Sequence, residues 1–337
     1  MKVLNIMLSR DLGGIQQAFI DYDEALRSQG FKVYNITSIF ARVNVLINKS
    51  LKLTNLGPWD IFSKLYLKFI ILLLKPDIII THGNRAIVFL DSKSLSIIIG
   101  VAHNYSTKYL KKCDYIIALT KQRHECLIKE NFLPSRIFTV PNMIRMPSVP
   151  KTKNYRQPII IGTIARFVKK KGLDVFIRAL ARLKHEKFPF KAIIGGEGEE
   201  KHYLINLVKE LGLREHVEFV GWTKDKEQFF QNIDIFALPS LSEPFGIIVL
   251  EAMAHKIPII ATKTEGPCEI IQDYRDLLCD INSSDDLADK LITLMSNYSL
   301  AQKYVDSNYL RLKETYDIAV VSKKLSSYLK LAVNNNV

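Results

Sequence analysis

Residues 232–271, NIDIFALPSLSEPFGIIVLEAMAHKIPIIATKTEGPCEII, constrain the fold of this chain more than any other stretch. The pattern predicts a strand, a polar loop, a helix and a second strand, over residues 233–238, 240–244, 247–255 and 258–261. Both strands are short apolar runs, which are typical of buried strands in a parallel sheet. Together these elements form one βαβ unit, and ligands of such units bind where the loop leaves the carboxyl end of the first strand.

Two carboxylates frame the start of the predicted helix. Glu243 lies in the loop, and Glu251 follows within the helix. The backbone amides of Phe245, Gly246 and Ile247 favour an anion at the helix start, and Gly246 has no side chain to block its approach. The arrangement suits a ligand with an anionic middle and a hydroxyl-rich group at each end, such as a sugar nucleotide. The alternative is a capped helix with two solvated glutamates.

The motif EPFG at residues 243–246, followed by Glu251 and by GPCEI at residues 266–270, resembles the E-x7-E signature of family 4 glycosyltransferases. The resemblance covers residues 232–271 in order, and weaker similarities extend over nearly the whole chain. It implies a retaining enzyme of the α/β class with the GT-B architecture, in which two Rossmann-like α/β/α domains face each other across a cleft.

The length of 337 residues, 48% of them hydrophobic, is sufficient for two domains of ordinary size. A proline-containing basic linker is predicted over residues 143–157. By the resemblance, residues 1–148 form an acceptor-binding domain and residues 149–316 a nucleotide-sugar-binding domain. Residues 317–333 form a last helix that crosses back to the first domain.

A basic loop follows the first predicted strand of the second domain, where Arg166 and Lys171-Gly172 resemble the Arg-x4-Lys-Gly segment of the family. When a glycosyl bond breaks, the nucleoside diphosphate leaves with growing negative charge. Fixed cations at its oxygens stabilise the transition state more than the ground state. Arg166 offers a planar fork and Lys171 a point charge. Lys169 and Lys170, between them, are interpreted as solvated positions of a helix start.

The amino terminus opens as a nucleotide-binding α/β domain, with strands over residues 3–8 and 31–36 and a helix over residues 15–29. A dinucleotide site is not indicated, because the intervening glycines do not follow G-x-G-x-x-G and no acidic residue ends the second strand. The resemblance places the amides of Gly13 and Gly14 near the phosphates of the donor. The alternative is a tight turn that needs positive φ.

Two histidines end predicted strands of the first domain, His82 after residues 77–81 and His103 after residues 96–102. The family places a histidine at the point that matches His103, in contact with the transferred sugar, and His82 is the weaker candidate. In the second domain, the resemblance implies that the glycine- and glutamate-rich loop at residues 195–200 borders the donor nucleoside. Val220 and Gly221 match the position at which the backbone of the family's enzymes contacts the nucleobase. Further strands are predicted over residues 114–119, 137–140, 158–163, 191–195 and 217–220.

The net charge of +13 is concentrated in residues 1–150, which hold 20 Lys and Arg against 10 Asp and Glu. No nucleic-acid-binding motif accompanies this charge, so an anionic membrane surface is the expected partner rather than nucleic acid. Lys64, Lys68 and Lys75 fall on one face of a predicted helix, beside several large apolar residues. This segment is either an amphipathic helix of a membrane interface or a core-packing helix with a solvated lysine edge.

Several classes of protein are not indicated. No apolar run is long enough to span a membrane, and the first residues do not form a signal peptide. The four cysteines form no C-x-x-C pair, and no D-x-D motif stands in a loop after a strand. We therefore expect no metal and no cofactor, and a cytoplasmic enzyme that can bind the inner face of the cytoplasmic membrane.

The sequence thus predicts a retaining glycosyltransferase that moves a hexosyl-type sugar from a UDP- or GDP-linked donor to a glycan or lipid-linked acceptor. This activity belongs to the biosynthesis of lipopolysaccharide, capsule or another cell-surface polysaccharide, and the implied mechanism is front-face substitution without a metal. The predicted catalytic residues are His103, Arg166, Lys171 and Glu243. The predicted donor-binding residues are Gly13, Gly14, Val220, Gly221, Phe245, Gly246, Ile247 and Glu251. The alternative is a GT-B protein that binds a sugar nucleotide without transferring it, as an inactive partner subunit or an epimerase.

Overall fold

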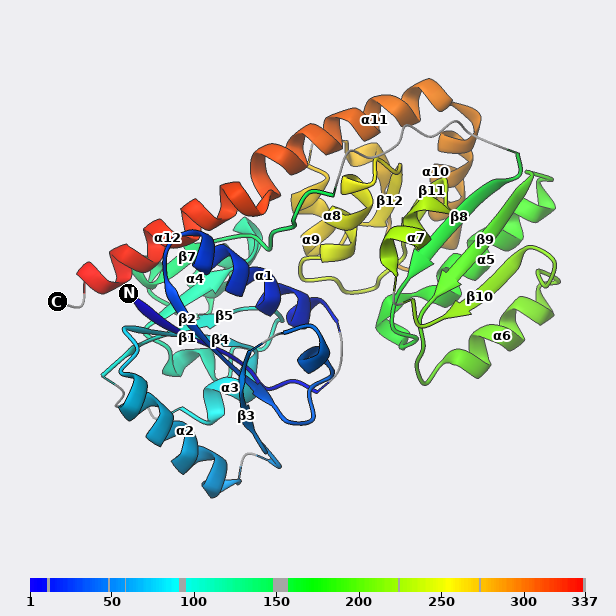
Figure 1. Ribbon diagram of the computed structural model, residues 1–337. Coiled ribbons are helices and arrows are strands. Elements are labelled where there is room, and N and C mark those ends of the chain that lie inside the picture. The colour runs from blue at the N-terminus through cyan, green and yellow to red at the C-terminus, as the bar shows by residue number, and fades with distance from the viewer. Residues whose placement is uncertain are drawn as a thin grey trace. The chain divides into compact units, whose positions relative to one another are not determined.

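The structure is a computed structural model that describes residues 1–10, 13–47, 49–57, 59–90, 95–147, 157–223, 225–272 and 274–335. It divides into two compact units (Figure 1): unit 1 is residues 1–145 with residues 315–337, and unit 2 is residues 146–314. The sequence placed these divisions after residues 148 and 316. Most of the predicted linker, residues 148–156, lies outside the described residues.

Unit 1 is built on a sheet whose strands lie in the order β3-β2-β1-β4-β5-β6-β7 and pair in parallel. The strands are β1 (Lys2–Met7), β2 (Lys32–Ser38), β3 (Leu51–Leu53), β4 (Ile78–His82), β5 (Ile97–Val101), β6 (Tyr115–Ala118) and β7 (Ile137–Thr139). The helices are α1 (Gly14–Ser28), α2 (Ile61–Leu74), α3 (Asn84–Val88), α4 (Lys121–Lys129) and α12 (Ile318–Asn334). Strands β4 and β6 are buried at every position, as expected for a sheet covered on both faces.

Unit 2 has a second parallel sheet, in the order β10-β9-β8-β11-β12-β13. Its strands are β8 (Ile159–Ile164), β9 (Phe190–Gly195), β10 (Val217–Gly221), β11 (Ile235–Leu238), β12 (Ile259–Thr262) and β13 (Leu278–Cys279). Its helices are α5 (Leu173–His185), α6 (Lys201–Glu210), α7 (Lys226–Gln231), α8 (Ile247–Ala254), α9 (Glu265–Ile270), α10 (Ser284–Ser296) and α11 (Tyr298–Arg311). Helix α5 packs against α6 and α10, and α8 packs against α9 and α11.

Both sheets follow the strand order of the Rossmann fold. In each one, the chain first builds outward on one side of the central strand and then returns to its other side. The reversal falls between β1 and β4 in unit 1 and between β8 and β11 in unit 2. Ligands of such sheets bind at this switch point, outside the carboxyl ends of the strands. The two-domain α/β fold predicted from the sequence is therefore confirmed.

The last helix of the chain belongs to unit 1. A π-helical turn at Leu312–Tyr316 follows α11, and α12 then starts at the cap formed by Asp317, whose side chain accepts a hydrogen bond from the amide of Ala319. Helix α12 packs against α1. It also packs against β7, because Phe138 of β7 stacks on Tyr328 of α12 with their ring centroids 4.7 Å apart.

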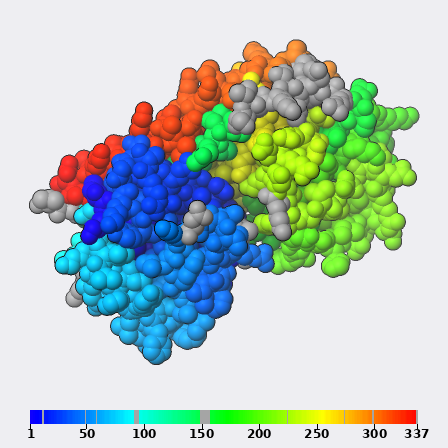
Figure 2. Space-filling model, in the orientation of Figure 1, coloured from blue at the N-terminus to red at the C-terminus, as the bar shows by residue number. Residues whose placement is uncertain are grey.

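Helix α2 exposes an apolar face. Its inward side is formed by Ser63, Leu67 and Ile70, and its exposed apolar side chains are Ile61, Phe62, Leu65, Tyr66, Phe69, Leu72 and Leu73. At roughly 100° per residue, the exposed set falls within about 140° of the helix circumference. Figure 2 shows this segment, in blue, on the surface of unit 1. The alternative of a core-packing helix with only a lysine edge is therefore wrong for most of its apolar residues.

No helix among the described residues is both long enough and apolar enough to cross a membrane.

Candidate functional site

Two of the predicted site residues of unit 2, Lys171 and Glu243, meet at its switch point, in the loops that follow β8 and β11. Lys171 donates to Glu243 at 2.5 Å, and both side chains are mostly buried, at 17% and 12% exposure. The amide of Leu241 donates to the carbonyl of Lys170 at 2.9 Å, which joins the two loops through their backbones. The structure thus brings together a cation and a carboxylate that are far apart in the sequence.

Gly172 allows this close approach of the two loops. Its φ is +61°, and a Cβ at this position would lie 2.1 Å from the carbonyl oxygen of Pro239. Only glycine combines that backbone conformation with the absence of a side chain. The turn at Lys169–Lys171 is therefore held directly against the start of the loop that carries Glu243.

The loop after β8 gathers more positive charge than the sequence predicted. Burial lowers the pKa of Lys170, and the neighbouring charges of Arg166 and Lys171 lower it further, while Glu243 opposes them. Arg166, Lys171 and Glu243 therefore all lie close enough to influence Lys170. Lys170 is exposed, as the sequence predicted, but it also belongs to this cluster, and a run of lysines gave no signal to separate it from Lys169.

The start of α8 lies beside this cluster. Gly246 has a φ of +86° and precedes the helix, which no side chain caps. A Cβ on Gly246 would lie 3.1 Å from Cγ of Glu243, so the carboxylate-bearing residue and the helix start are neighbours. Gly266 supports them from behind, because its amide donates to the carbonyl of Glu243 and a Cβ on it would lie 1.9 Å from the carbonyl oxygen of Phe245. Ile247 is the first residue of the helix.

Glu251, in α8, has a partner that the sequence did not indicate. Lys226, at the start of α7, donates to both carboxylate oxygens at 2.6 and 3.0 Å. The carboxylate is 12% exposed and the lysine 42% exposed. Each of the two glutamates of the motif is thus held by a lysine. Lys226 is distant in sequence, and only the tertiary structure places it there.

The loops after β9 and β10 border the same edge of the sheet. The amide of Gly196 donates to the carbonyl of Gly221 at 2.7 Å, and the amide of Phe167 donates to that of Glu197 at 2.8 Å. A Cβ on Gly196 would lie 1.8 Å from the carbonyl oxygen of Ala165, so the loops are in backbone contact. Val220, next to Gly221, is exposed. The loop after β9 is therefore a wall beside the cation cluster.

The two histidines of unit 1 lie at the carboxyl edge of its sheet and contact each other. Nε2 of His103 lies 2.9 Å from Nδ1 of His82, and the rings stack with centroids 5.1 Å apart. His82 is 2% exposed. Burial lowers the pKa of His103 to about 3, and burial together with the charge of His103 lowers the pKa of His82 well below its ordinary value. Both rings are therefore neutral near pH 7.

At Gly13, the glycine-containing loop of unit 1 does not form the tight turn that was the alternative to a phosphate-binding loop. Gly13 precedes α1 with a φ of 171°, which is extended backbone that any residue adopts, so a tight turn with positive φ is wrong for Gly13. Gly14 is the first residue of α1. Residues 11 and 12 of the predicted loop lie outside the described residues.

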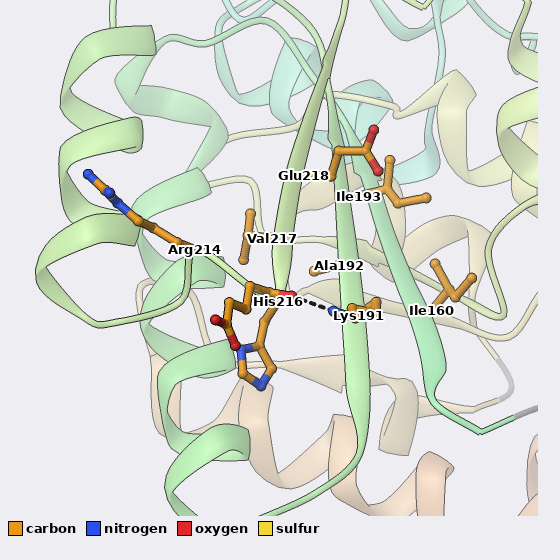
Figure 3. Close-up of a pocket in the computed structure, with 9 residues that line it drawn as sticks. Ile160, Lys191, Ala192, Ile193, Arg214, His216, Val217 and Glu218 are labelled. Atoms are coloured by element: carbon orange, nitrogen blue, oxygen red, sulfur yellow. Dashed lines mark hydrogen bonds between the residues drawn. The ribbon is translucent and has the colours of Figure 1, made fainter.

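A cavity of unit 2 lies away from these residues (Figure 3). It has a volume of about 460 Å³ and is lined mainly by residues at the amino ends of β9 and β10, together with the loop that precedes β10. Figure 3 shows Lys191, Arg214 and His216 around it. The predicted site residues lie at the carboxyl ends of the strands, so this cavity is at the opposite edge of the sheet. In the described part of the chain, no group of three or more His, Cys, Asp or Glu side chains could hold a metal ion.

Comparison with known proteins indicates the class of enzyme. Residues 147–311 match the family model of Glycosyl transferases group 1. The chain is 24% identical over 343 residues to the lipopolysaccharide core biosynthesis glycosyltransferase LpsE of Rhizobium meliloti (strain 1021), with 98% of each protein covered. It is 36% identical over 162 residues to the O-antigen biosynthesis glycosyltransferase WclY of Escherichia coli, covering 46% of this chain and 44% of WclY. The matched region therefore spans less than half of either protein.

Among solved structures, the fold is similar to that of Anabaena Alr3699/HepE in complex with UDP. The TM-score is 0.82 at 19% sequence identity, over 98% of this chain and all of the other. The group 1 match covers the unit in which the cation cluster, the two glutamates and the start of α8 are found. The chain is therefore a glycosyltransferase of the GT-B fold, and its residues 147–311 match the model of the glycosyl transferases group 1 family.

Proposed function

We propose that this glycosyltransferase moves a hexosyl-type sugar from a UDP- or GDP-linked donor to a glycan or lipid-linked acceptor of lipopolysaccharide or another cell-surface polysaccharide. The observation that carries the proposal is the cluster of Arg166, Lys170 and Lys171 at the switch point of unit 2, beside the start of α8. The names of LpsE and WclY, which refer to lipopolysaccharide core and O-antigen biosynthesis, support the class of acceptor.

The cation cluster stabilises the leaving group, which is the nucleoside diphosphate. A departing nucleoside diphosphate gains negative charge, and three cations with one carboxylate among them leave an excess of positive charge to meet it. The start of α8 adds the partial positive charge of a helix amino terminus. Glu243 then accepts hydrogen bonds from hydroxyls of the sugar, and Glu251 from hydroxyls of the nucleoside. His103 contacts the transferred sugar.

We further propose that transfer retains the anomeric configuration by front-face substitution. The bond from the anomeric carbon to the diphosphate breaks, a bond to the acceptor oxygen forms on the same face, and the leaving phosphate takes the proton of the acceptor hydroxyl. Retaining hydrolases instead use a carboxylate nucleophile against the anomeric carbon. The ion pair of Glu243 with Lys171 argues against that role for Glu243.

The same cations support transfer without a cofactor or a divalent metal. Metal ions in many phosphate sites neutralise charge on the leaving group. Here Arg166, Lys170 and Lys171 supply that charge from the protein itself. We therefore expect EDTA to leave the rate of transfer unchanged, and loss of activity in EDTA with recovery in manganese would contradict this expectation.

We propose that unit 1 binds the inner face of the cytoplasmic membrane through α2. Phe62 is 86% exposed, and Trp59, just before the helix, is 72% exposed. Lys64 and Lys68 lie along one edge of the apolar face, and Lys75 ends the helix. Exposed apolar side chains enter the interface of a bilayer while adjacent lysines meet anionic headgroups. This location would place the enzyme beside a lipid-linked acceptor.

The experiment combines binding with single-site variants. Calorimetry should show that UDP or GDP binds the wild type. In an activity assay, the enzyme should release the nucleoside diphosphate from the sugar nucleotide only when the acceptor is present. Arg166→Ala and Lys171→Ala should each lower kcat about 10²- to 10³-fold, as expected for loss of one preorganised stabilising group. Lys169→Ala removes the same charge from the same turn and should have little effect, which makes it the matched control.

Two results would contradict the proposal. Failure of both nucleoside diphosphates to bind would remove the donor class. A rise in KM alone in the Arg166 and Lys171 variants would show uniform binding rather than stabilisation of the transition state.

The anomeric configuration of the product, measured by NMR, tests retention separately. The assignment of the chain as a glycosyltransferase already favours transfer over the alternative of binding without transfer.

A further inference from the structure

A chain of hydrogen bonds crosses the core of unit 1 and ends at His103. Nε2 of His103 lies 2.9 Å from Nδ1 of His82, and Nε2 of His82 lies 2.9 Å from Oδ1 of Asn5. The amide nitrogen of Asn5 donates to the carbonyl of Phe19 at 3.2 Å and to Oδ1 of Asn35 at 3.1 Å. Asn5, Asn35 and His82 are all buried. The chain therefore links a residue at the edge of the sheet to side chains in its interior.

The direction of every bond in this chain follows from one backbone group. The carbonyl of Phe19 can only accept, so the amide nitrogen of Asn5 must face it and Oδ1 of Asn5 must face His82. Nε2 of His82 therefore carries the hydrogen, and in a neutral ring Nδ1 is then an acceptor. Nε2 of His103 must in turn donate to that acceptor. This leaves Nδ1 of His103 as a lone-pair acceptor.

The surroundings keep both rings in this neutral state. Phe19 and Tyr22 pack edge-on against His82, with ring centroids 5.6 and 4.9 Å away. Burial disfavours the charged imidazolium, which lowers the pKa of both histidines. A protonated His103 would have hydrogens on both nitrogens and would be a donor at Nδ1. In the neutral Nε2–H tautomer, Nδ1 carries no hydrogen and accepts a hydrogen bond instead.

We propose that Asn5 and His82 are positioning residues that hold His103 in its Nε2–H tautomer, so that Nδ1 accepts a hydrogen bond from a hydroxyl of the transferred sugar. The role of the sugar rests on the proposed function, whereas the tautomer rests on the hydrogen bonds alone. His103 then selects a ligand that presents an O–H group. In this role it neither donates a proton to the leaving group nor binds a phosphate oxygen.

The tautomer can be measured without substrate. In protein labelled with ¹⁵N at histidine, long-range ¹H–¹⁵N spectra distinguish protonated from unprotonated ring nitrogens, and variants of His82 and His103 assign the signals. We expect both rings to be neutral with the hydrogen on Nε2 at pH 7. A hydrogen on Nδ1 of His103 would overturn the inference.

Variants along the chain separate positioning from stability. Asn5→Leu removes the acceptor that orients His82 and should give His103 a mixture of tautomers, with kcat/KM reduced roughly 3- to 10-fold. His82→Phe keeps a ring but removes the acceptor for His103 and should act similarly, whereas His82→Gln supplies an amide oxygen and should restore the tautomer. Asn35→Leu is the matched control, because the Phe19 carbonyl still orients Asn5 and the tautomer should remain. An unchanged spectrum in Asn5→Leu would overturn the inference.

Modified donors test the direction of the hydrogen bond to the sugar. Fluorine replaces a hydroxyl without being able to donate, so deoxy and deoxyfluoro donors should lose kcat/KM equally at one position of the ring. That loss should disappear in His103→Ala, which identifies the hydroxyl. Recovery of the rate with fluorine would show that His103 donates and would overturn the inference. Absence of transfer with every donor would instead count against the proposed function, and the tautomer measurement would still stand.

Discussion

Lys170 shares the loop after β8 with two other cations, and this crowding has a measurable consequence. Burial and the charges of Arg166 and Lys171 lower the pKa of Lys170. In the free protein, Lys170 therefore loses its proton at a lower pH than an ordinary lysine does. A bound diphosphate favours the protonated form. The affinity for UDP should therefore fall as the pH rises through this lowered pKa.

The variant Lys170→Arg tests this prediction, because a guanidinium stays protonated across the accessible range. Dissociation constants for UDP, measured by calorimetry from neutral to alkaline pH, should rise earlier for the wild type than for Lys170→Arg. Parallel curves for the two proteins would mean that Lys170 does not contact the ligand. Lys169→Arg, in the same turn, is the control and should follow the wild type.

The pair of Glu251 and Lys226 gives a second prediction at the scale of single residues. If Glu251 accepts hydrogen bonds from the nucleoside, Glu251→Ala should weaken binding of free UDP about tenfold or more, because a hydrogen bond to a charged group contributes ~1.5–3 kcal/mol. Lys226→Ala leaves the carboxylate in place and should weaken binding much less. Calorimetric affinities that are the same for Glu251→Ala and the wild type would exclude the nucleoside role.

The sequence could predict only some of these residues. Glu243, Gly246 and Glu251 belong to one βαβ unit, so the spacing along the chain is enough to place them around one helix start. Lys226 joins them from another helix, and nothing in the local pattern indicates that contact. Lys170 differs from Lys169 only in its tertiary surroundings, which a run of identical residues conceals.

At the scale of elements, the apolar runs predicted the long strands well, and the exceptions have physical reasons. The predicted strands at residues 77–81, 96–102 and 217–220 overlap β4, β5 and β10. Strand β3 was missed because it has three residues, two of them exposed, at the edge of the sheet. For α2 the sequence left two alternatives open, because a helix that is apolar nearly all round does not show which side packs inward.

The orientation of α2 leads to the prediction for the membrane. Replacing Lys64, Lys68 and Lys75 together with glutamine should reduce cosedimentation with vesicles that contain anionic lipid, since each lysine near such a surface contributes ~1 kcal/mol. Replacing Phe62 and Leu73 with serine should reduce it as well, because both are strongly exposed on the apolar face. Neutral vesicles should retain the protein less than anionic vesicles do.

The controls separate the membrane from other occupants of this face. The melting temperature should be measured for every variant. Leu67 and Ile70 are the side chains of α2 that pack inward, so substitutions of outward residues should leave the melting temperature nearly unchanged. If vesicle binding is unaffected in both sets of variants, a protein partner or a second copy of the chain is the better explanation. Size-exclusion chromatography then tests self-association.

At the scale of the whole molecule, each unit has its own sheet and its own buried interior. Leu4, Ile79 and Ile116 belong to one core cluster of unit 1, and Phe176, Phe236 and Leu291 are buried in unit 2. Unit 2 is also continuous in sequence, from residue 146 to residue 314, whereas unit 1 is completed by the returning α12. Both properties are expected of a domain that can fold alone.

The last prediction follows from this organisation. A fragment of residues 146–314 contains Arg166, Lys170, Lys171, Glu243 and Glu251, so it should unfold cooperatively and bind UDP with nearly the affinity of the full chain. It lacks His103 and the rest of unit 1, so it should not transfer sugar. Circular dichroism establishes that the fragment is folded, and calorimetry measures its affinity for UDP. A folded fragment with greatly weakened affinity would show that unit 1 supplies much of the binding energy for the donor, and the amides of Gly13 and Gly14 would be the first groups to test.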